Sequence, residues 1–248
     1  MAIFLTRLLR KRSKYIYKDF FMTREDANLN LKSNSNYGSK SYDSRAIKNL
    51  KFSEKYTQGR DMIVPLVLSI LNKNKCTILD IGGGVNAVFS HLSELQKSQY
   101  QCLVLERAEI IQSLNGKVSE KHGGYIQYID SIDFVTTMDI AYFGSSIQYI
   151  EDYELLLNKI SMLSPQFIIF SESIFTKSTE DYFVLQVNMF PNIFPNRFVS
   201  EKKLTDLMDG LNYKCTYNKA VPGDFSHETI KRNSYDCKTL VFKRNIDT

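Results

Sequence analysis

Short apolar runs alternate with amphipathic helical segments through the middle of the chain. Strands that alternate with helices in this way indicate βα units that close into a parallel sheet. The strands that the pattern predicts cover residues 77–81, 101–105, 124–129, 139–143 and 167–170. The helices that it predicts between them cover residues 87–95, 110–119 and 153–163.

The chain continues after the fifth strand with a further helix and two more strands. Ser200 can cap a helix with apolar positions at 204, 207, 208 and 211, and strands are predicted near 213–217 and 235–242. Together these elements predict an α/β fold, with a Rossmann-like, mostly parallel sheet of seven strands. Helices are expected on both faces of the sheet, and the last strand is expected to be antiparallel.

The region before the first strand has a different character. Residues 26–44 are rich in Asn, Ser, Lys and Gly, which predicts a loop or linker, whereas apolar positions between 46 and 71 predict two helices. We therefore divide the chain into a basic N-terminal segment with its linker, residues 1–45, and an α/β domain, residues 46–248.

Positive charge is concentrated at the N-terminal end. Residues 1–75 hold 16 basic and 6 acidic side chains, whereas residues 76–248 hold 16 basic and 21 acidic ones. The first residues form either a basic amphipathic helix that lies on anionic lipid at the inner face of the membrane, or a solvated or core-docking helix. The acidic balance of the remainder argues against a nucleic-acid partner there, because such binding depends on clustered Lys and Arg.

Several classes of protein are excluded by other features. Arg7 interrupts the first apolar run, so no signal peptide is expected, and no apolar run is long enough for a membrane span. The four cysteines are widely spaced, which predicts neither a disulfide framework nor a metal site. These features predict a cytoplasmic protein.

The first predicted strand ends in Asp80 and leads into Gly82, Gly83 and Gly84. Consecutive glycines at this point allow the backbone to approach a ligand closely, although a turn that binds nothing is an alternative. Gly82, Gly84 and Ala87 fit a dinucleotide fingerprint, and the next strand ends in Glu106 at a suitable interval for a ribose. However, a carboxylate at Asp80 would oppose a pyrophosphate, whereas it favours the cationic half of S-adenosylmethionine.

The glycine loop resembles the first motif of class I S-adenosylmethionine-dependent methyltransferases, D-x-G-x-G-x-G. Asp80, Gly82 and Gly84 match the motif, and Asn86 replaces its last glycine. The resemblance implies S-adenosylmethionine as the cofactor, with Glu106 on the ribose hydroxyls. The cofactor-binding residues that it implies are Asp80, Gly82, Gly83, Gly84, Glu106, Asp130, Ser131, Phe143 and Gly144.

Residues 183–186, 195–198, 204–211 and 233–235 resemble a narrower group, methyltransferases associated with bacterial surface-polysaccharide biosynthesis. This resemblance implies a small-molecule acceptor, a sugar or a polysaccharide precursor. The alternatives are an NAD-dependent enzyme, or a non-catalytic module that binds nucleic acid or membrane through the basic N-terminus.

A sugar hydroxyl as the acceptor would benefit from a general base. His227 is the first candidate, because it lies in the loop between the last two strands, although an exposed loop histidine without a catalytic role is the favoured interpretation. Glu172 and Asp130 are further candidates. The side chains expected to contact the acceptor are Tyr182, Gln186, Asn188 and Arg197.

Overall fold

The computed structural model describes residues 17–31, 62–84, 88, 99–114, 125–187, 193–221, 227, 229–231 and 234–245. The predicted basic helix before residue 17, most of the predicted helix 87–95, Asn86 and Asn188 therefore lie outside the described residues.

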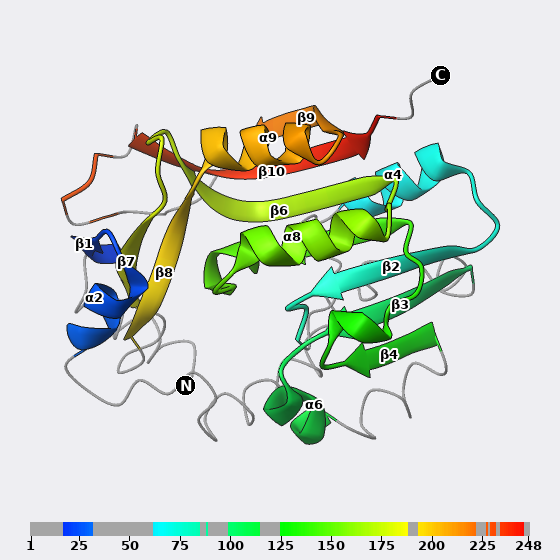
Figure 1. Cartoon of the computed structure of the whole chain (residues 1–248), viewed down its shortest axis with the longest axis horizontal. Helices are drawn as coiled ribbons and strands as arrows, with labels where there is room; N and C mark the ends of the chain where they lie inside the picture. Colours follow the sequence, from blue (N-terminus) through cyan, green and yellow to red (C-terminus); the bar gives the residue numbers. More distant parts are fainter. Residues whose placement is uncertain are drawn as a thin grey trace, which may run out of the picture.

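Five parallel strands form the centre of the sheet. They are β2 (Cys76–Ile81), β3 (Tyr100–Leu105), β4 (Ile126–Ile129), β5 (Ile140–Gly144) and β6 (Phe167–Thr176). Their spatial order is β4-β3-β2-β5-β6, so β2 lies between β3 and β5 and the strand order reverses there (Figure 1). A hairpin of β9 (Tyr213–Ala220) and β10 (Tyr235–Arg244) continues the sheet, with β10 antiparallel to β6.

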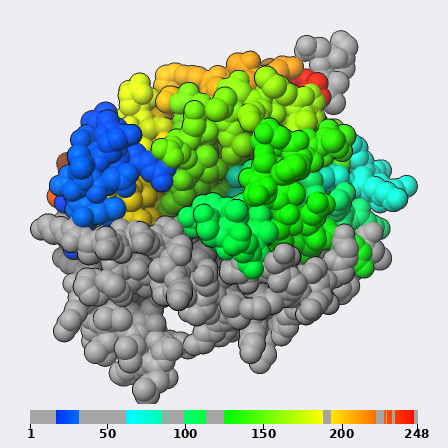
Figure 2. All heavy atoms as spheres, turned by 60° about the horizontal axis from the view of Figure 1, so that its bottom comes forward, coloured from blue at the N-terminus to red at the C-terminus, as the bar shows by residue number. Residues whose placement is uncertain are grey.

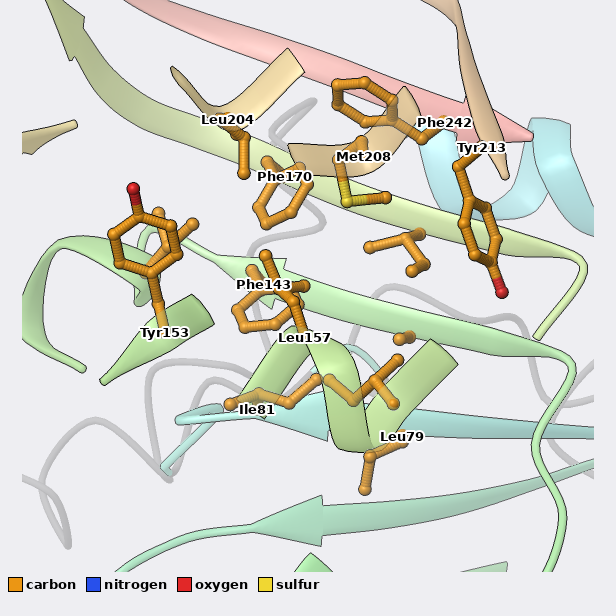
Figure 3. Packing of buried hydrophobic residues seen from close by; sticks show 14 of the residues in the cluster. Leu79, Ile81, Phe143, Tyr153, Leu157, Phe170, Leu204, Met208, Tyr213 and Phe242 are labelled. Carbon is orange, nitrogen blue, oxygen red and sulfur yellow. The ribbon is translucent and has the colours of Figure 1, made fainter. Parts of the chain in front are cut away.

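Helices cover both faces of these strands because each face is apolar. On one face, α4 (Ile63–Leu71) buries Val64, Val67 and Leu68. On the other face lie α8 (Tyr153–Met162) and α9 (Glu201–Gly210). Figure 3 shows side chains of these two helices among the aromatic rings of the sheet. The shorter α6 (Ala108–Leu114) follows β3.

Three further strands extend the sheet beyond β6. The second half of β6 pairs with β8 (Ile193–Ser200). The other edge of β8 pairs with β7 (Tyr182–Val187), and β7 in turn pairs with β1 (Tyr17–Phe21). The prediction of seven strands is therefore not confirmed, because ten strands of mixed orientation form the sheet in the described part of the chain. The methyltransferase-like α/β architecture with a mostly parallel centre is present.

The N-terminal residues belong to this extension. Tyr17 of β1 is 3% exposed, and its ring packs edge-on against Phe198 of β8 at 5.1 Å. The following helix α2 (Arg24–Leu29) buries Ala27 against β7. In Figure 2 the blue N-terminal residues lie against the yellow residues of these strands. The predicted boundary at residue 45 thus does not separate the N-terminal segment from the sheet.

Among the described residues, no helix is long and apolar enough to span a bilayer.

Candidate functional site

The glycine loop lies at the carboxyl end of β2, where the strand order reverses. This position is the usual ligand crevice of an open parallel sheet, because the loops on the two sides diverge. Gly82 and Gly84 have φ angles of +72° and +54°, which side chains rarely adopt. The N–H of Gly82 donates to the carbonyl of Leu105 at 2.8 Å, so the loop is fastened to the end of β3.

Asp80 lies beneath this loop and is fully buried. Its Oδ2 accepts a hydrogen bond from the backbone N–H of Val88 at 2.5 Å, and a Cβ on Gly83 would lie only 2.4 Å from the same oxygen. The sequence placed Asp80 beside the cationic half of the donor. In the structure its carboxylate packs against the loop backbone, and shaping that backbone is the role that this geometry supports.

Glu106 follows β3 directly and lies beside the same loop. Its Oε1 accepts the N–H of Arg107 at 3.0 Å, and a weaker contact comes from the backbone of Gly84. Burial raises the pKa of Glu106, and these hydrogen bonds together with the Arg107 charge oppose the rise. Glu106 therefore lies at the end of β3 beside the glycine loop, and its hydrogen bonds to the ribose hydroxyls stay a prediction.

Tyr128 of β4 completes the arrangement, although the sequence analysis assigned it only to a strand. Its hydroxyl donates to the carbonyl of Gly84 at 2.8 Å, and burial, followed by the charges of Asp80 and Glu106, raises its pKa. Gly84 is therefore held through its C=O by Tyr128, and it lies beside the carboxylate of Glu106. In the sequence, the role of Tyr128 is indicated only by the polar hydroxyl of its ring near the end of an apolar strand.

Asp130 and Ser131 come directly after β4, at the same edge of the sheet as Glu106. Asp130 is exposed. The hydroxyl of Ser131 accepts the N–H of Asp133 at 3.1 Å and caps the short helix η4 (Ile132–Phe134). Asp130 is therefore placed to meet a ligand, whereas the hydroxyl of Ser131 is engaged in a local cap.

Phe143 and Gly144 at the end of β5 differ sharply in their surroundings. The side chain of Phe143 is fully buried and stacks on Phe170 at 4.9 Å, within the core beneath α8 (Figure 3). A predicted cofactor contact through this side chain is therefore not supported by its position. Gly144 is half-buried and leads into a loop in which Ser146 approaches Gly82, where a Cβ would lie 2.9 Å from Cβ of Ser146.

His227 is buried rather than exposed, and both nitrogens of its ring are hydrogen-bonded within the chain. It is 6% exposed, and its Nδ1 accepts the backbone N–H groups of Thr229 and Ile230, each at 3.0 Å. Its Nε2 lies 2.9 Å from the carbonyl of Asp19, so the tautomer with the proton on Nε2 satisfies all three contacts. This geometry argues against His227 as the general base and indicates that it joins β1 to the loop before β10.

Replacing His227 by Ala should therefore lower stability and spare catalysis. Loss of these buried hydrogen bonds is expected to cost about 1 to 2 kcal/mol of unfolding free energy. Urea denaturation measures this cost, and Lys231→Ala, an exposed change nearby, is the control. A variant with wild-type stability and greatly reduced methyl transfer would restore His227 as a candidate base.

Glu172 occupies an irregular position on β6. It has a φ angle of +47°, and it lies where the register between β6 and β10 shifts. Ser145, after β5, also has a positive φ angle of +55°, and its hydroxyl donates to the carbonyl of Glu172 at 2.8 Å. Unfavourable backbone angles of this kind cluster at functional sites. Glu172 lies at the carboxyl edge of the sheet, because its carbonyl is bonded to Ser145 in the loop that reaches Gly82.

The residues expected to contact an acceptor are distributed over two strands, β7 and β8. Gln186 is half-buried and hydrogen-bonded to Tyr149 and Asn196. Tyr182 is buried and packs on Phe198, so it lies in the hydrophobic packing of the extension.

Arg197 is 9% exposed and is engaged by its own chain. It donates to the carbonyls of Ile150 and Glu151 at 3.1 and 2.7 Å. Its guanidinium also lies 5.0 Å from the ring centroids of Tyr153 and Phe183. Arg197 therefore anchors the loop before α8 to β8.

No protein-family model matches the chain, and no curated protein matches it. Solved structures do share its fold. Magnesium protoporphyrin IX methyltransferase from Synechocystis, solved with S-adenosylmethionine bound, has a TM-score of 0.51 at 11% identity over 90% of this chain and 92% of that one. An S-adenosylmethionine-dependent methyltransferase from Clostridium acetobutylicum has a TM-score of 0.50 at 12% identity, over 83% and 99% of the two chains. The chain thus has the class I methyltransferase fold.

Proposed function

We propose that this protein transfers a methyl group from S-adenosylmethionine to a small-molecule acceptor. The observation that carries the proposal is the glycine loop at the switch point of a class I methyltransferase fold, where Tyr128 holds the carbonyl of Gly84 and Glu106 lies beside the loop. The same fold in proteins solved with S-adenosylmethionine and S-adenosylhomocysteine supports it.

The residues present fit this cofactor. Gly82 to Gly84 provide a backbone surface without Cβ atoms, and Glu106 provides a carboxylate that can accept two ribose hydroxyls. Asp130 lies at the same edge, where a contact to the adenine amine is proposed. The chemistry that S-adenosylmethionine supplies when bound is an electrophilic methyl group on a sulfonium.

The buried carboxylate of Asp80 disfavours the alternative cofactor, NAD. A dinucleotide site directs free backbone N–H groups at a helix N-terminus toward the pyrophosphate. Here Asp80 already accepts the N–H of Val88, and its charge would repel a phosphate. Ala87, the last position of the dinucleotide fingerprint, lies outside the described residues.

For the acceptor we propose a hydroxyl-bearing molecule, a sugar or a surface-polysaccharide precursor, as the narrower resemblance implies. β7 and β8, which contain part of that resemblance, lie next to the loop after β5. In this mechanism the protein holds the acceptor oxygen in line with the methyl group, and Glu172 is proposed to accept the hydroxyl proton.

Membrane or nucleic-acid binding through the basic N-terminus depends on residues before position 17, outside the described part of the chain. Co-sedimentation with anionic vesicles, compared between the full chain and a chain lacking residues 1–16, tests membrane contact. This deletion keeps β1 in place, whereas removal of residues 1–24 would also remove a strand of the sheet.

Isothermal titration decides between the cofactors. The full chain should bind S-adenosylmethionine and S-adenosylhomocysteine, with no measurable heat from NAD under the same conditions. Binding of NAD alone, strengthened by Asp80→Asn through relief of charge repulsion, would overturn the proposed function.

A further inference from the structure

Three buried side-chain oxygens, two in the segment after β5 and one on β8, have no hydrogen-bond partner among the described residues. They are Oγ of Ser146, Oε1 of Gln148 and Oδ1 of Asn196, in residues that are 6%, 6% and 0% exposed. Most buried polar atoms in native proteins are paired, because an unpaired one loses its hydration without compensation. Three such oxygens in one region therefore require an explanation.

The three residues belong to two elements that pack together. Ser146 and Gln148 flank the start of η5 (Ile147–Tyr149), the short helix after β5, and Asn196 lies on β8. Two contacts join η5 to the strands: the hydroxyl of Tyr149 donates to Gln186 at 2.9 Å, and its ring packs edge-on against Phe194 at 5.7 Å. Arg197 strengthens this junction by binding the carbonyls that follow η5.

The hydrogen bonds around Gln186 fix which atom of Asn196 remains unpaired. Oε1 of Gln186 accepts two donors, the hydroxyl of Tyr149 and Nδ2 of Asn196, the latter at 2.7 Å. The amide nitrogen of Asn196 is thereby used, and its carbonyl oxygen Oδ1 is left over. A group that completes this arrangement must therefore donate a hydrogen bond to Asn196.

The region adjoins the proposed methyl donor site. Ser146 approaches the loop so closely that a Cβ on Gly82 would collide with it. From Ser146, η5 leads to Gln148 and Tyr149, and Tyr149 contacts the strand that holds Gln186. The unpaired oxygens thus begin beside the glycine loop and extend toward β8.

The charges around these oxygens are also informative. The side-chain hydrogen bonds of Asn196 and Gln186 in the described part of the chain involve only neutral groups. The nearby cation, Arg197, is directed instead to the carbonyls of Ile150 and Glu151 and lies 3.8 Å from Asp181. A carboxylate or phosphate would therefore meet amide oxygens with no cation to compensate, whereas a hydroxyl can donate to each of them.

We propose that Ser146, Gln148 and Asn196 form the acceptor subsite, and that this subsite recognises a neutral, polyhydroxylated molecule by accepting hydrogen bonds from its hydroxyls. The proposal rests on the methyltransferase function and narrows its acceptor to a class that excludes anionic molecules. Gln186 and Tyr149 are positioning residues in this site, because they orient Asn196 and η5.

The test uses the full chain saturated with S-adenosylhomocysteine and two probes, N-acetylglucosamine and the anionic sugar glucuronate, titrated by saturation-transfer NMR. N-acetylglucosamine should bind at least tenfold more tightly than glucuronate. Gln148→Met and Asn196→Leu should each weaken its binding at least tenfold, with Gln127→Met, an exposed change on β4, as the matched control. The melting temperature of Gln148→Met should stay unchanged or rise, because this change replaces an unpaired buried oxygen by an apolar group. Asn196→Leu also loses the hydrogen bond from Nδ2 to Gln186, so a modest fall in its melting temperature is expected.

The inference is overturned if the wild type binds glucuronate as well as N-acetylglucosamine, if it binds neither probe, or if both variants retain the affinity of the wild type. Loss of stability in Gln148→Met would also overturn it, because the oxygen of Gln148 would then have a structural partner. Failure of S-adenosylhomocysteine to bind the wild type would instead refute the methyltransferase function. The sugar titration without the cofactor would then still decide whether the three oxygens bind hydroxyls.

Discussion

Replacing Gly83 by Ala is expected to weaken binding of S-adenosylmethionine at least about a hundredfold, equivalent to about 2.7 kcal/mol. The added Cβ would lie 2.4 Å from Oδ2 of Asp80. That oxygen has little room to move, because it is fully buried and bound to the N–H of Val88. The loop must therefore shift, or the buried carboxylate must lose its partner, which would also lower stability by about 1 to 3 kcal/mol.

The matched control for this change is Gly210→Ala. Gly210 ends α9, and an added Cβ would have open space around it, so a neutral or slightly stabilising effect is expected. Isothermal titration and thermal unfolding monitored by circular dichroism measure the two effects separately. Wild-type affinity in a folded Gly83→Ala protein would show that the loop does not contact the cofactor.

Loss of the Glu106 carboxylate should have the second largest effect. Glu106→Ala removes an acceptor for two ribose hydroxyls, and charge-assisted hydrogen bonds are worth about 1.5 to 3 kcal/mol, which predicts affinity at least about tenfold lower. Glu109→Ala, an exposed change in the first turn of α6, is the control and should leave affinity unchanged.

The affinity of the wild type should also depend on pH. Because burial raises the pKa of Glu106, the carboxyl group becomes protonated at a higher pH than an exposed one. The protonated form accepts fewer hydrogen bonds, so binding should weaken as the pH falls through that pKa. Titrations across this range should show the weakening in the wild type and not in Glu106→Gln. An identical pH dependence in both proteins would assign the effect to another group.

The sequence predicted the central part of the fold well, because its signals there are local. Apolar runs such as 77–81 and 167–170 form buried strands. They can be recognised without knowing which strands lie beside them. Asp80, the glycines and Glu106 come together because the ends of adjacent parallel strands meet at one edge of the sheet.

The rest depends on pairings between distant segments, which a single sequence does not reveal. β7 and β8 follow no strict alternation because both of their faces are covered, and β1 is a strand only because β7 is beside it. His227 was misread for the same reason, since its partner Asp19 lies at the opposite end of the chain. The sequence does not single out Asn196 as a binding residue. Its oxygen is left unpaired only because its amide nitrogen is bonded to Gln186, which lies on another strand.

The segment that contains β7 and β8 begins and ends at the same point of the sheet. Thr176, the last residue of β6, is paired with Ser200, the residue that caps α9. A chain without residues 177–199 could therefore pass from β6 to α9 with the βα units and the glycine loop in place. Residues 177–199 are therefore arranged as an insertion whose two ends meet at a single strand pair, so that the length of the segment can change without moving the ends of β6 and α9 apart.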